Sequence, residues 1–294
     1  MLRNIIIGTI WVSFLLFMRT GAFGADDLLG QTFKGFRYPD YDNRGQLKME
    51  IAGDKAQILP KDLIQISNLK MTFYEEGKMI MRITTPLCFY DRIKQTAMST
   101  AQVCVMRAEI KITGRGFDWN EKAGRIRINN NTRVVLQKTE PKSYFDVEGT
   151  TTSTPTSLET DTNNTVITST RLVFDQKKST VVFEGNTVVT DPALKIASDR
   201  LTVSFSNDKK VELINAEGNV VITRDIMQAT AKMAIYAVSD GKITLWGNPS
   251  VMRQKDYLTA ETIVFWRNSN RIICEPNAHL TIYSEDMNSQ FKKN

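Results

Sequence analysis

A single spacing pattern recurs seven times along the chain and constrains its fold more than any other feature. An apolar residue is followed two positions later by a small residue, and two further apolar residues lie three and five positions beyond it. The small residues stand at positions 53, 85, 114, 169, 198, 231 and 260, so the steps are 32, 29, 55, 29, 33 and 29 residues. A period near thirty residues, interrupted once, indicates stacked structural repeats. The seven copies are Ile51-Gly53-Ala56-Ile58, Ile83-Thr85-Cys88-Tyr90, Ile112-Gly114-Phe117-Trp119, Ile167-Ser169-Leu172-Phe174, Ile196-Ser198-Leu201-Val203, Ala229-Ala231-Ala234-Tyr236 and Leu258-Ala260-Ile263-Phe265.

The interval of three residues inside this pattern determines which face of the strand the apolar side chains occupy. Side chains on a strand alternate between the two faces, so an odd interval moves the apolar set to the other face. Every copy makes the change at the same place. The pattern therefore predicts long strands that bend or bulge at or just after the small residue.

A second pattern alternates with the first and ends in a pair that tolerates left-handed backbone angles. Two apolar residues, one position apart, lead to Gly185-Asn186, Gly218-Asn219 and Gly247-Asn248, with weaker copies at Pro276-Asn277 and Asn130-Asn131. Gly and Asn accept positive φ more readily than other residues, so each pair marks either a bend within a strand or a hairpin turn. Each repeat then has at least two strands, which need stacking to bury a face.

The N-terminus has the composition of an export signal. Arg3 precedes an apolar run over residues 5–18, and small residues at 21–24 follow Arg19. This pattern predicts a signal peptide over residues 1–24 and an extracytoplasmic location, the periplasm. A retained inner-membrane anchor is the alternative, although the run is shorter than the about 20 residues that a bilayer requires. Removal of residues 1–24 lowers the net charge from +6 to +4, because the segment holds two arginines and no acid.

The chain lacks the clustered side chains that catalysis or nucleic-acid binding needs. Its lysines and arginines are spread along the sequence, without a basic cluster interleaved with aromatic residues, so we expect no nucleic-acid partner. The single histidine, His279, lies in an alternating strand pattern without a nucleophile nearby, and we expect neither an enzyme nor a cofactor or metal site. Asp54, Asp199 and Glu261 recur after the small residue, but Arg115 occupies the same place in another copy, which indicates an outward-facing corner.

Three cysteines are too few for a disulfide scaffold or a zinc site. Cys88, Cys104 and Cys274 stand where apolar residues are expected. Buried thiols are favoured, and pairing of Cys88 with Cys104 remains an alternative if their strands are neighbours.

Together these motifs resemble the OstA-like lipopolysaccharide transport family. Residues 166–283 resemble its LptA type, in Ala197-Ser198-Asp199-Arg200-Leu201 and in the Gly-Asn strands. Residues 36–136 are similar to the LptC type, in Ile83-Thr84-Thr85-Pro86 and in Ile112-Thr113-Gly114-Arg115-Gly116-Phe117-Asp118-Trp119. The domains expected are a signal peptide over 1–24, LptC-like repeats over 25–148, a Thr/Ser-rich linker or loop over 149–165, LptA-like repeats over 166–284 and a polar tail over 285–294.

The resemblance implies an all-β fold, a β-taco or β-jellyroll of two facing antiparallel sheets with bent strands. Such proteins shield the acyl chains of lipopolysaccharide in an apolar trough and join head to tail through their end strands. The partners implied are lipopolysaccharide or a similar anionic lipid, other Lpt-type bridge components at the edge strands, and further copies of the chain. A structural filament or scaffold of the envelope, with a filled core and no ligand, is the alternative function. A third, a solenoid enzyme acting on polysaccharide, would need carboxylates such as Asp199 and Glu261 to face one groove.

The residues expected to line the trough are the apolar members of the two patterns. The same side chains would fill a closed core if the sheets met, and the sequence leaves both arrangements open. These residues are Phe117, Trp119, Ile128, Leu172, Phe174, Val181, Phe183, Leu201, Val203, Phe205, Ile214, Ala234, Tyr236, Leu245, Ile263 and Phe265.

Overall fold

The computed structural model describes residues 29–136, 164–208, 210–266, 269 and 271–283. Within these ranges the chain forms nineteen β-strands and no helix, and the strand pairs are antiparallel. The predicted all-β class is therefore confirmed. In the same ranges, no helix has the length and apolar character that a membrane crossing needs. The expected signal peptide (1–24), nearly all of the linker (149–165) and the polar tail (285–294) lie outside the described residues.

Contacts divide the chain into two compact units, which are described separately: unit 1 over residues 1–122 and unit 2 over 123–294. This boundary differs from the one expected at residue 148. The reason is β7 (Arg125–Leu136), which pairs with the first two strands beyond the linker, β8 (Thr165–Ser169) and β9 (Arg171–Asp175). The last strand before the linker thus packs with the LptA-like repeats.

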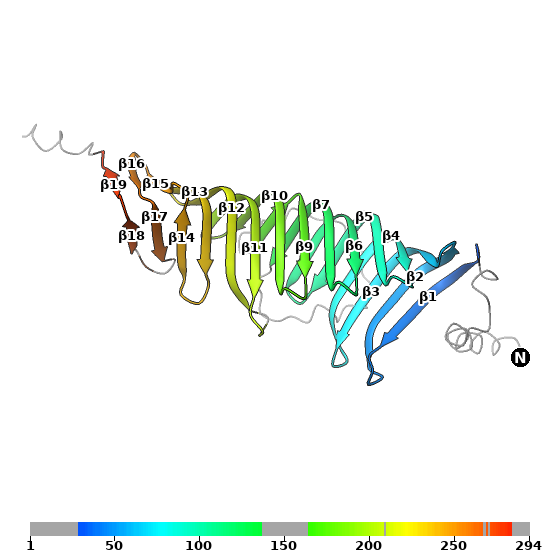
Figure 1. Cartoon of the computed structure of the whole chain (residues 1–294). Coiled ribbons are helices and arrows are strands. Elements are labelled where there is room, and N and C mark those ends of the chain that lie inside the picture. The colour runs from blue at the N-terminus through cyan, green and yellow to red at the C-terminus, as the bar shows by residue number, and fades with distance from the viewer. Residues whose placement is uncertain (1–28, 137–163, 209, 267–268, 270, 284–294) are drawn as a thin grey trace, which may run out of the picture. The chain divides into compact units, whose positions relative to one another are not determined.

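Unit 1 is a meander of six long strands, each paired with the next (Figure 1). The three strands that carry the first spacing pattern, β2, β4 and β6, change the face that they bury near their middle, as the pattern predicts. In β4, for example, Ile83, Thr85, Cys88 and Tyr90 are all buried. Because Thr85 and Cys88 are three positions apart, a regular strand would place them on opposite faces. The strands are β1 (Thr32–Tyr41), β2 (Leu47–Leu59), β3 (Leu63–Glu75), β4 (Lys78–Asp91), β5 (Thr96–Arg107) and β6 (Ile110–Asn120).

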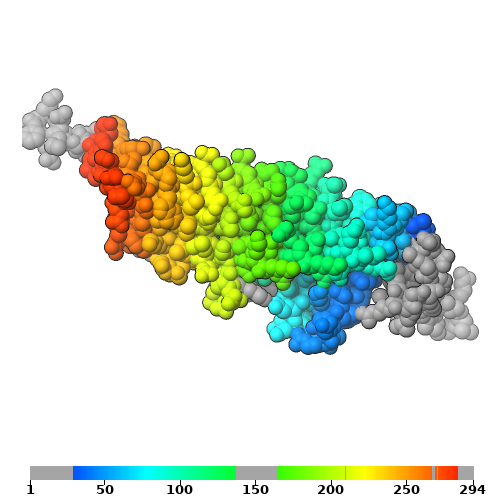
Figure 2. All heavy atoms as spheres, in the orientation of Figure 1, coloured from blue at the N-terminus to red at the C-terminus, as the bar shows by residue number. Residues whose placement is uncertain are grey.

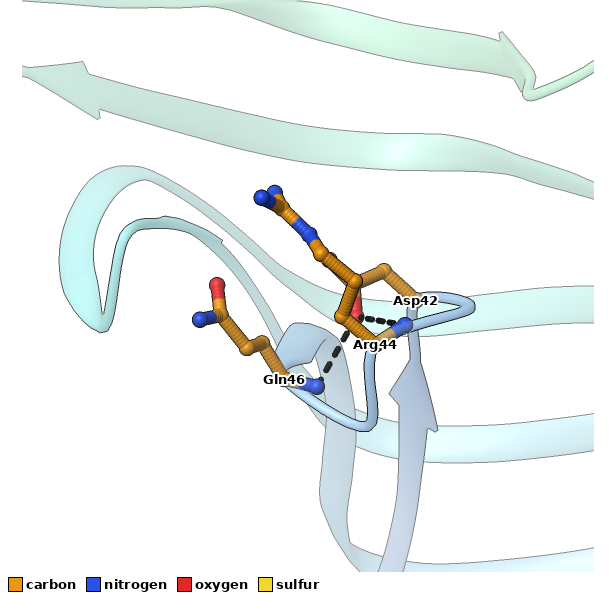
Figure 3. A network of polar contacts seen from close by, with 3 residues as sticks. All are labelled: Asp42, Arg44 and Gln46. Carbon is orange, nitrogen blue, oxygen red and sulfur yellow. Dashed lines mark hydrogen bonds and ion pairs between the residues drawn. The ribbon is translucent and has the colours of Figure 1, made fainter.

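A polar turn closes the β1–β2 hairpin (Figure 3). The Asp42 carboxylate accepts hydrogen bonds from the backbone N–H groups of Arg44 (2.9 Å) and Gln46 (2.8 Å). These bonds, the one from Gln46 above all, lower the pKa of Asp42. The turn residue Gly45 has φ +77°, a value that glycine adopts without a steric penalty.

Unit 2 has thirteen strands of the same construction. The succession from β9 to β14 can be followed in Figure 1. Its long strands bend. Its short strands come in pairs, and each pair, such as β8 and β9, corresponds to one long strand that is interrupted at the bend. Thus β10 pairs with β9 through its first half and with β8 through its second half. The remaining strands are β10 (Thr180–Asp191), β11 (Leu194–Phe205), β12 (Val211–Arg224), β13 (Met227–Ala237), β14 (Lys242–Trp246), β15 (Ser250–Arg253), β16 (Asp256–Thr259), β17 (Thr262–Trp266), β18 (Ile272–Glu275) and β19 (His279–Thr281).

The bends divide unit 2 into two sheets that share their long strands. Sheet I begins with residues 125–128 of β7 and continues through β9. It then includes the half of each strand from β10 to β13 that pairs on from β9, and it ends with β14, β17 and β18. Sheet II holds residues 132–136 of β7, β8, the other halves of β10 to β13, and then β15, β16 and β19. Buried side chains lie on the same side of the bent strands in both sheets, so the two inner faces enclose one interior.

Both sequence patterns coincide with the bends. The register shifts after Ala197 in β11, at Ser198, and between Glu184 and Thr187 in β10, at Gly185-Asn186. Asn186 and Asn219 have φ +48° and +46°, and the preceding glycines have φ +79° and +75°. The Gly-Asn pairs are therefore bends inside strands or breaks between half-strands, such as Gly247-Asn248 between β14 and β15, and the predicted bulges are confirmed.

The bend glycines are required by a neighbouring strand as well as by their φ values. A Cβ on Gly218 would lie 2.9 Å from the Asp199 Cβ, and a Cβ on Gly247 would lie 2.6 Å from the Lys232 Cβ. Asp199 and Lys232 each follow the small residue of the first pattern. The two patterns thus meet in space, where the residue after the small residue packs over the glycine of the next strand.

Candidate functional site

The inner face of sheet I carries two unbroken rows of apolar side chains across eight adjacent strand segments. In the row beside the bend, the corner row, every side chain is at most 5% exposed. Cross-strand pairing joins each member to the next. The corner row consists of Ile128, Leu172, Phe183, Leu201, Ala216, Ala234, Leu245 and Ile263.

The second row of sheet I lies two residues farther from the bend and is called the mouth row. Pairing again joins its members in sequence, from Ile126 to Phe265. Ile126, Val203 and Ile243 are buried, whereas the other five are half-buried. The full row consists of Ile126, Phe174, Val181, Val203, Ile214, Tyr236, Ile243 and Phe265. Burial thus decreases from the bend toward the free ends of the strands, as expected for an interior that is open there.

Sheet II presents a matching apolar row on its inner face. Its members pair in sequence from Val134 to Leu258 and are buried or half-buried. The row consists of Val134, Ile167, Val189, Ile196, Ile222, Ala229, Val251 and Leu258. Apolar side chains therefore cover both walls of the interior of unit 2.

The structure places the sixteen predicted trough residues in both units. Seven of them lie in the corner row and six in the mouth row, and Phe205 is half-buried at the end of β11. Phe117 and Trp119 lie in unit 1 and are buried. Sequence reasoning missed Ile126, Ala216 and Ile243, although all three stand in copies of the Gly-Asn pattern. It also missed the sheet II row, whose members begin the first pattern or follow the Gly-Asn pairs.

The interior of unit 1 is spanned by aromatic pairs. Tyr38 and Tyr90 come from opposite sides of the strand bends, and their ring centroids lie 6.3 Å apart. Phe73 and Trp119 make an edge-to-face contact at 5.9 Å in the same way. Burial raises the pKa of the Tyr90 hydroxyl. At the level of Trp119 the unit has a filled core, and the alternative of a closed sandwich applies there.

An ion pair lies beside these aromatic residues in unit 1. The Lys48 Nζ, near the start of β2, contacts the Glu121 Oε1 just after β6, and the Asp40 Oδ2 lies 3.8 Å from the same nitrogen. The bond to Glu121 raises the pKa of Lys48. The ion pair therefore connects the start of β2 with the residue that follows β6, and Asp40 of β1 lies near the same nitrogen.

The recurring acids after the small residue have a structural role. Asp199 accepts a hydrogen bond from Asn219 Nδ2 at 2.9 Å, and Glu261 accepts one from Asn277 Nδ2 at 2.6 Å. Asp54 is paired in the same way with Asn68, at 2.7 Å. Each asparagine has positive φ at the bend of the neighbouring strand. The acids are exposed and fasten adjacent bends to each other, which agrees with the outward-facing corner expected from the sequence.

The outer face of sheet I is charged. Glu184 lies between Arg171 (3.5 Å) and Arg200 (3.4 Å) on the adjoining strands. Arg125 contacts Asp175 at 2.9 Å and holds the pKa of that carboxyl below its usual range. These groups lie on the opposite face from the apolar rows, so the outer face of sheet I carries ion pairs over β7 to β11.

The cysteines are unpaired, as the sequence favoured, but burial is confirmed for Cys88 alone, because Cys104 and Cys274 are half-buried. The three cysteines are free thiols; Cys88 is buried, and burial raises its pKa to about 12. His279 is exposed on β19. Among the residues that the structure describes, no group of three or more His, Cys, Asp and Glu side chains could hold a metal ion.

Strands at the two ends of the described chain have open edges. Among the described residues, β1 pairs only with β2, β18 only with β17, and β19 only with β16. Ile272 and Leu280 continue the inner rows onto β18 and β19 but are 44% and 61% exposed, because no further strand of the described residues covers them. In Figure 2 these strands form the surface at that end of unit 2. Unpaired strand edges of this kind accept an additional strand.

Unit 2 is thus a β-jellyroll of stacked antiparallel repeats with an apolar interior between two sheets. Residues 166–271 match the family model described as "LptA/(LptD N-terminal domain) LPS transport protein". The resemblance to the LptA type drawn from the Gly-Asn strands is therefore confirmed over that range. The LptC-like character of the first repeats stays a prediction.

A solved structure gives a weaker likeness. It is the crystal structure of LptH, "the LptA homologous periplasmic component of the conserved lipopolysaccharide transport device from Pseudomonas aeruginosa". The identity is 16%, the match covers 38% of this chain and 89% of that chain, and the TM-score is 0.35. A search of curated proteins gave no match.

Proposed function

We propose that this protein is a periplasmic component of lipopolysaccharide transport that holds acyl chains in the interior of unit 2. The observation that carries the proposal is the pair of facing apolar walls, in which burial decreases from the corner row to the mouth row. An acyl chain laid along the mouth row would cover side chains such as Phe174, Ile214 and Tyr236, which the protein leaves half-exposed. Each methylene removed from water contributes about 0.8 kcal/mol.

The open strands support a place for the protein in a bridge. The β18 and β19 edges expose backbone groups together with Ile272 and Leu280, and β1 offers an edge in unit 1. Pairing of one such edge with a strand of another Lpt-type component, or of a second copy, would extend the apolar walls of unit 2 into the partner. The protein would then act as a passive conduit, and the transport energy would come from a partner.

The filled interior of unit 1 favours a division of roles. The Phe73–Trp119 and Tyr38–Tyr90 pairs occupy the space between its strands, whereas the mouth row of unit 2 has half-exposed members along most of its length. Lipid uptake is therefore assigned to unit 2. Phe117 and Trp119, which the sequence placed in the trough, would serve as the core of unit 1.

Gel filtration with and without lipopolysaccharide separates this proposal from a scaffold without ligand. We expect the purified chain to take up lipopolysaccharide, or a long-chain amphiphile, and to elute with it. The same lipid at equal concentration, run without protein, gives the position of free micelles. Polymers that form without lipid, combined with no uptake, would contradict the carrier and support the scaffold.

A further inference from the structure

The outer face of one wall of unit 1 carries more bases than acids. This wall, called the first wall, consists of the strand segments on one side of the bends, which pair with one another from β1 to β6. The segments are residues 36–41, 47–52, 69–75, 78–84, 102–107 and 110–114. Ile51, Met71 and Ile83 are buried on its inner face, so the residues that alternate with them point outward. Among those outward residues Glu50 is acidic, and four are basic: Arg37, Lys70, Arg82 and Lys111, which we call the basic face.

The members of the basic face are spread across the sheet. Arg37 and Lys70 both pair with Ala52, from opposite sides. Arg82 and Lys111 are likewise separated by a single strand, β5. Because neighbouring strands lie about 4.8 Å apart, the basic face extends over roughly 24 Å from β1 to β6. These bases therefore cannot converge on one small anion, but each can meet a separate one.

Most of the charge on the basic face is not compensated within the fold. Of its four members, Arg37 alone has an ion pair among the described residues, with Glu50 at 3.5 Å. Arg82 is half-buried, and its Nε is buried without a hydrogen-bond partner in that part of the chain. A partly buried cation without a partner is unfavourable, so this position favours an anion from outside the chain. On the outer face of sheet I in unit 2, by contrast, Glu184 lies between two arginines.

The surrounding charges do not cancel the excess. The turns that border the first wall hold three bases and four acids: Arg44, Lys78 and Arg107 with Asp42, Glu75, Glu76 and Glu109. At the bends, Arg115 and Asp54 offset each other. The outer face of the second wall is balanced, with Lys34 and Lys55 against Asp91 and Asp118. Its turns add four bases and two acids, and ion pairs engage two of those bases, Arg92 and Lys94.

We propose that the basic face of unit 1 binds the surface of a membrane that contains anionic lipids. Such a surface offers many separate phosphate groups over a wide area, and its negative potential attracts lysine and arginine. Both side chains donate charge-assisted hydrogen bonds to phosphate oxygens. The inference concerns the outside of unit 1 and does not depend on lipid uptake by unit 2.

The side chains between the bases favour a membrane surface over a protein partner. Protein interfaces usually centre on aromatic or other large apolar side chains. The line of paired residues that starts at Arg37 and Lys70 continues instead with short side chains: Thr84, Cys104 and Thr113. Charge thus dominates what this face can recognise.

The test measures binding of the full chain to vesicles by co-sedimentation. One set of vesicles contains phosphatidylcholine alone, and the other contains equal parts of phosphatidylcholine and the anionic phosphatidylglycerol. We expect wild type to bind the anionic vesicles about tenfold more tightly than the neutral ones, and this preference should shrink as salt is added. The apolar run over residues 5–18 is present in every sample and does not affect the comparison between variants.

A variant with Arg37→Gln, Lys70→Gln and Lys111→Gln should lose the preference. All three side chains are exposed, so we expect the fold to be retained, which circular dichroism verifies. Binding to the anionic vesicles should weaken about tenfold, and binding to the neutral vesicles should stay within about twofold of wild type.

A matched variant removes the same charge from the second wall and its turn, through Lys34→Gln, Lys55→Gln and Lys61→Gln. Its binding to the anionic vesicles should stay within about twofold of wild type, because these exposed lysines face away from the membrane. Equal losses in the two variants, or no loss in the first, would overturn the inference. Wild type without a preference for anionic vesicles would overturn it as well and would favour an acidic protein as the partner of the basic face.

Discussion

Replacement of Ile214 by aspartate is expected to weaken acyl-chain binding at least tenfold while leaving the fold intact. Ile214 lies in the middle of the mouth row, between Val203 and Tyr236, and is half-buried. A carboxylate there would have to lose water when a chain covers it, and burying an unpaired charge is strongly unfavourable. A tenfold loss corresponds to about 1.4 kcal/mol, less than the contribution of two methylenes.

Leu213→Asp supplies the matched control for this substitution. Leu213 is the preceding residue of β12, is also half-buried, and points to the outer face of the same sheet. Binding of an uncharged long-chain monoacylglycerol is measured for both variants by fluorescence displacement, with circular dichroism to verify that β-structure is retained. If Leu213→Asp weakened binding as much as Ile214→Asp, the inner face would have no special role.

Gly218→Ala is expected to destabilise unit 2 by about 3 kcal/mol. A left-handed backbone angle costs an alanine about 1–2 kcal/mol, and Gly218 has φ +75°. In addition, the new Cβ would lie 2.9 Å from the Asp199 Cβ and 2.3 Å from its Oδ2, so the strands must separate. The shift would also disturb the hydrogen bond that Asn219 donates to Asp199. Urea unfolding measures the change in free energy.

Gly124→Ala isolates the backbone part of that effect within the same unit. Gly124 has φ +63°, but the nearest atom to its Cβ would be the Gln176 Cβ at 3.4 Å, an ordinary contact. This variant should lose only about 1–2 kcal/mol. Gly218→Ala introduced together with Asp199→Gly, compared with Asp199→Gly alone, should likewise show only the backbone part. Equal losses for the two alanine variants would exclude the proposed packing of the bends.

The bends could be predicted from the sequence because they depend on local rules. Strand parity alone requires a change of face between Ser198 and Leu201, and Gly218-Asn219 marks a backbone that few other residues adopt. Both features were found where the pattern placed them. The partnership of Asp199 with Asn219 could not be predicted in the same way, because it depends on the register between two strands.

Whether the interior between the strands is filled or open also depends on side-chain contacts, which the residue spacing in the sequence does not reveal. Trp119 and Phe174 occupy the same place in their copies of the first pattern, yet Trp119 contacts Phe73 in a filled core and Phe174 is half-buried in the mouth row.

Photo-crosslinking to bound lipopolysaccharide tests the central claim most directly. A photoreactive amino acid replaces Phe174 in the mouth row or, as the control, Arg171 on the outer face of the same strand, β9. We predict a lipid adduct from position 174 and none from position 171, because only the inner face meets the acyl chains. Adducts of equal yield from both positions, or from position 171 alone, would contradict an acyl-chain site between the two sheets of unit 2.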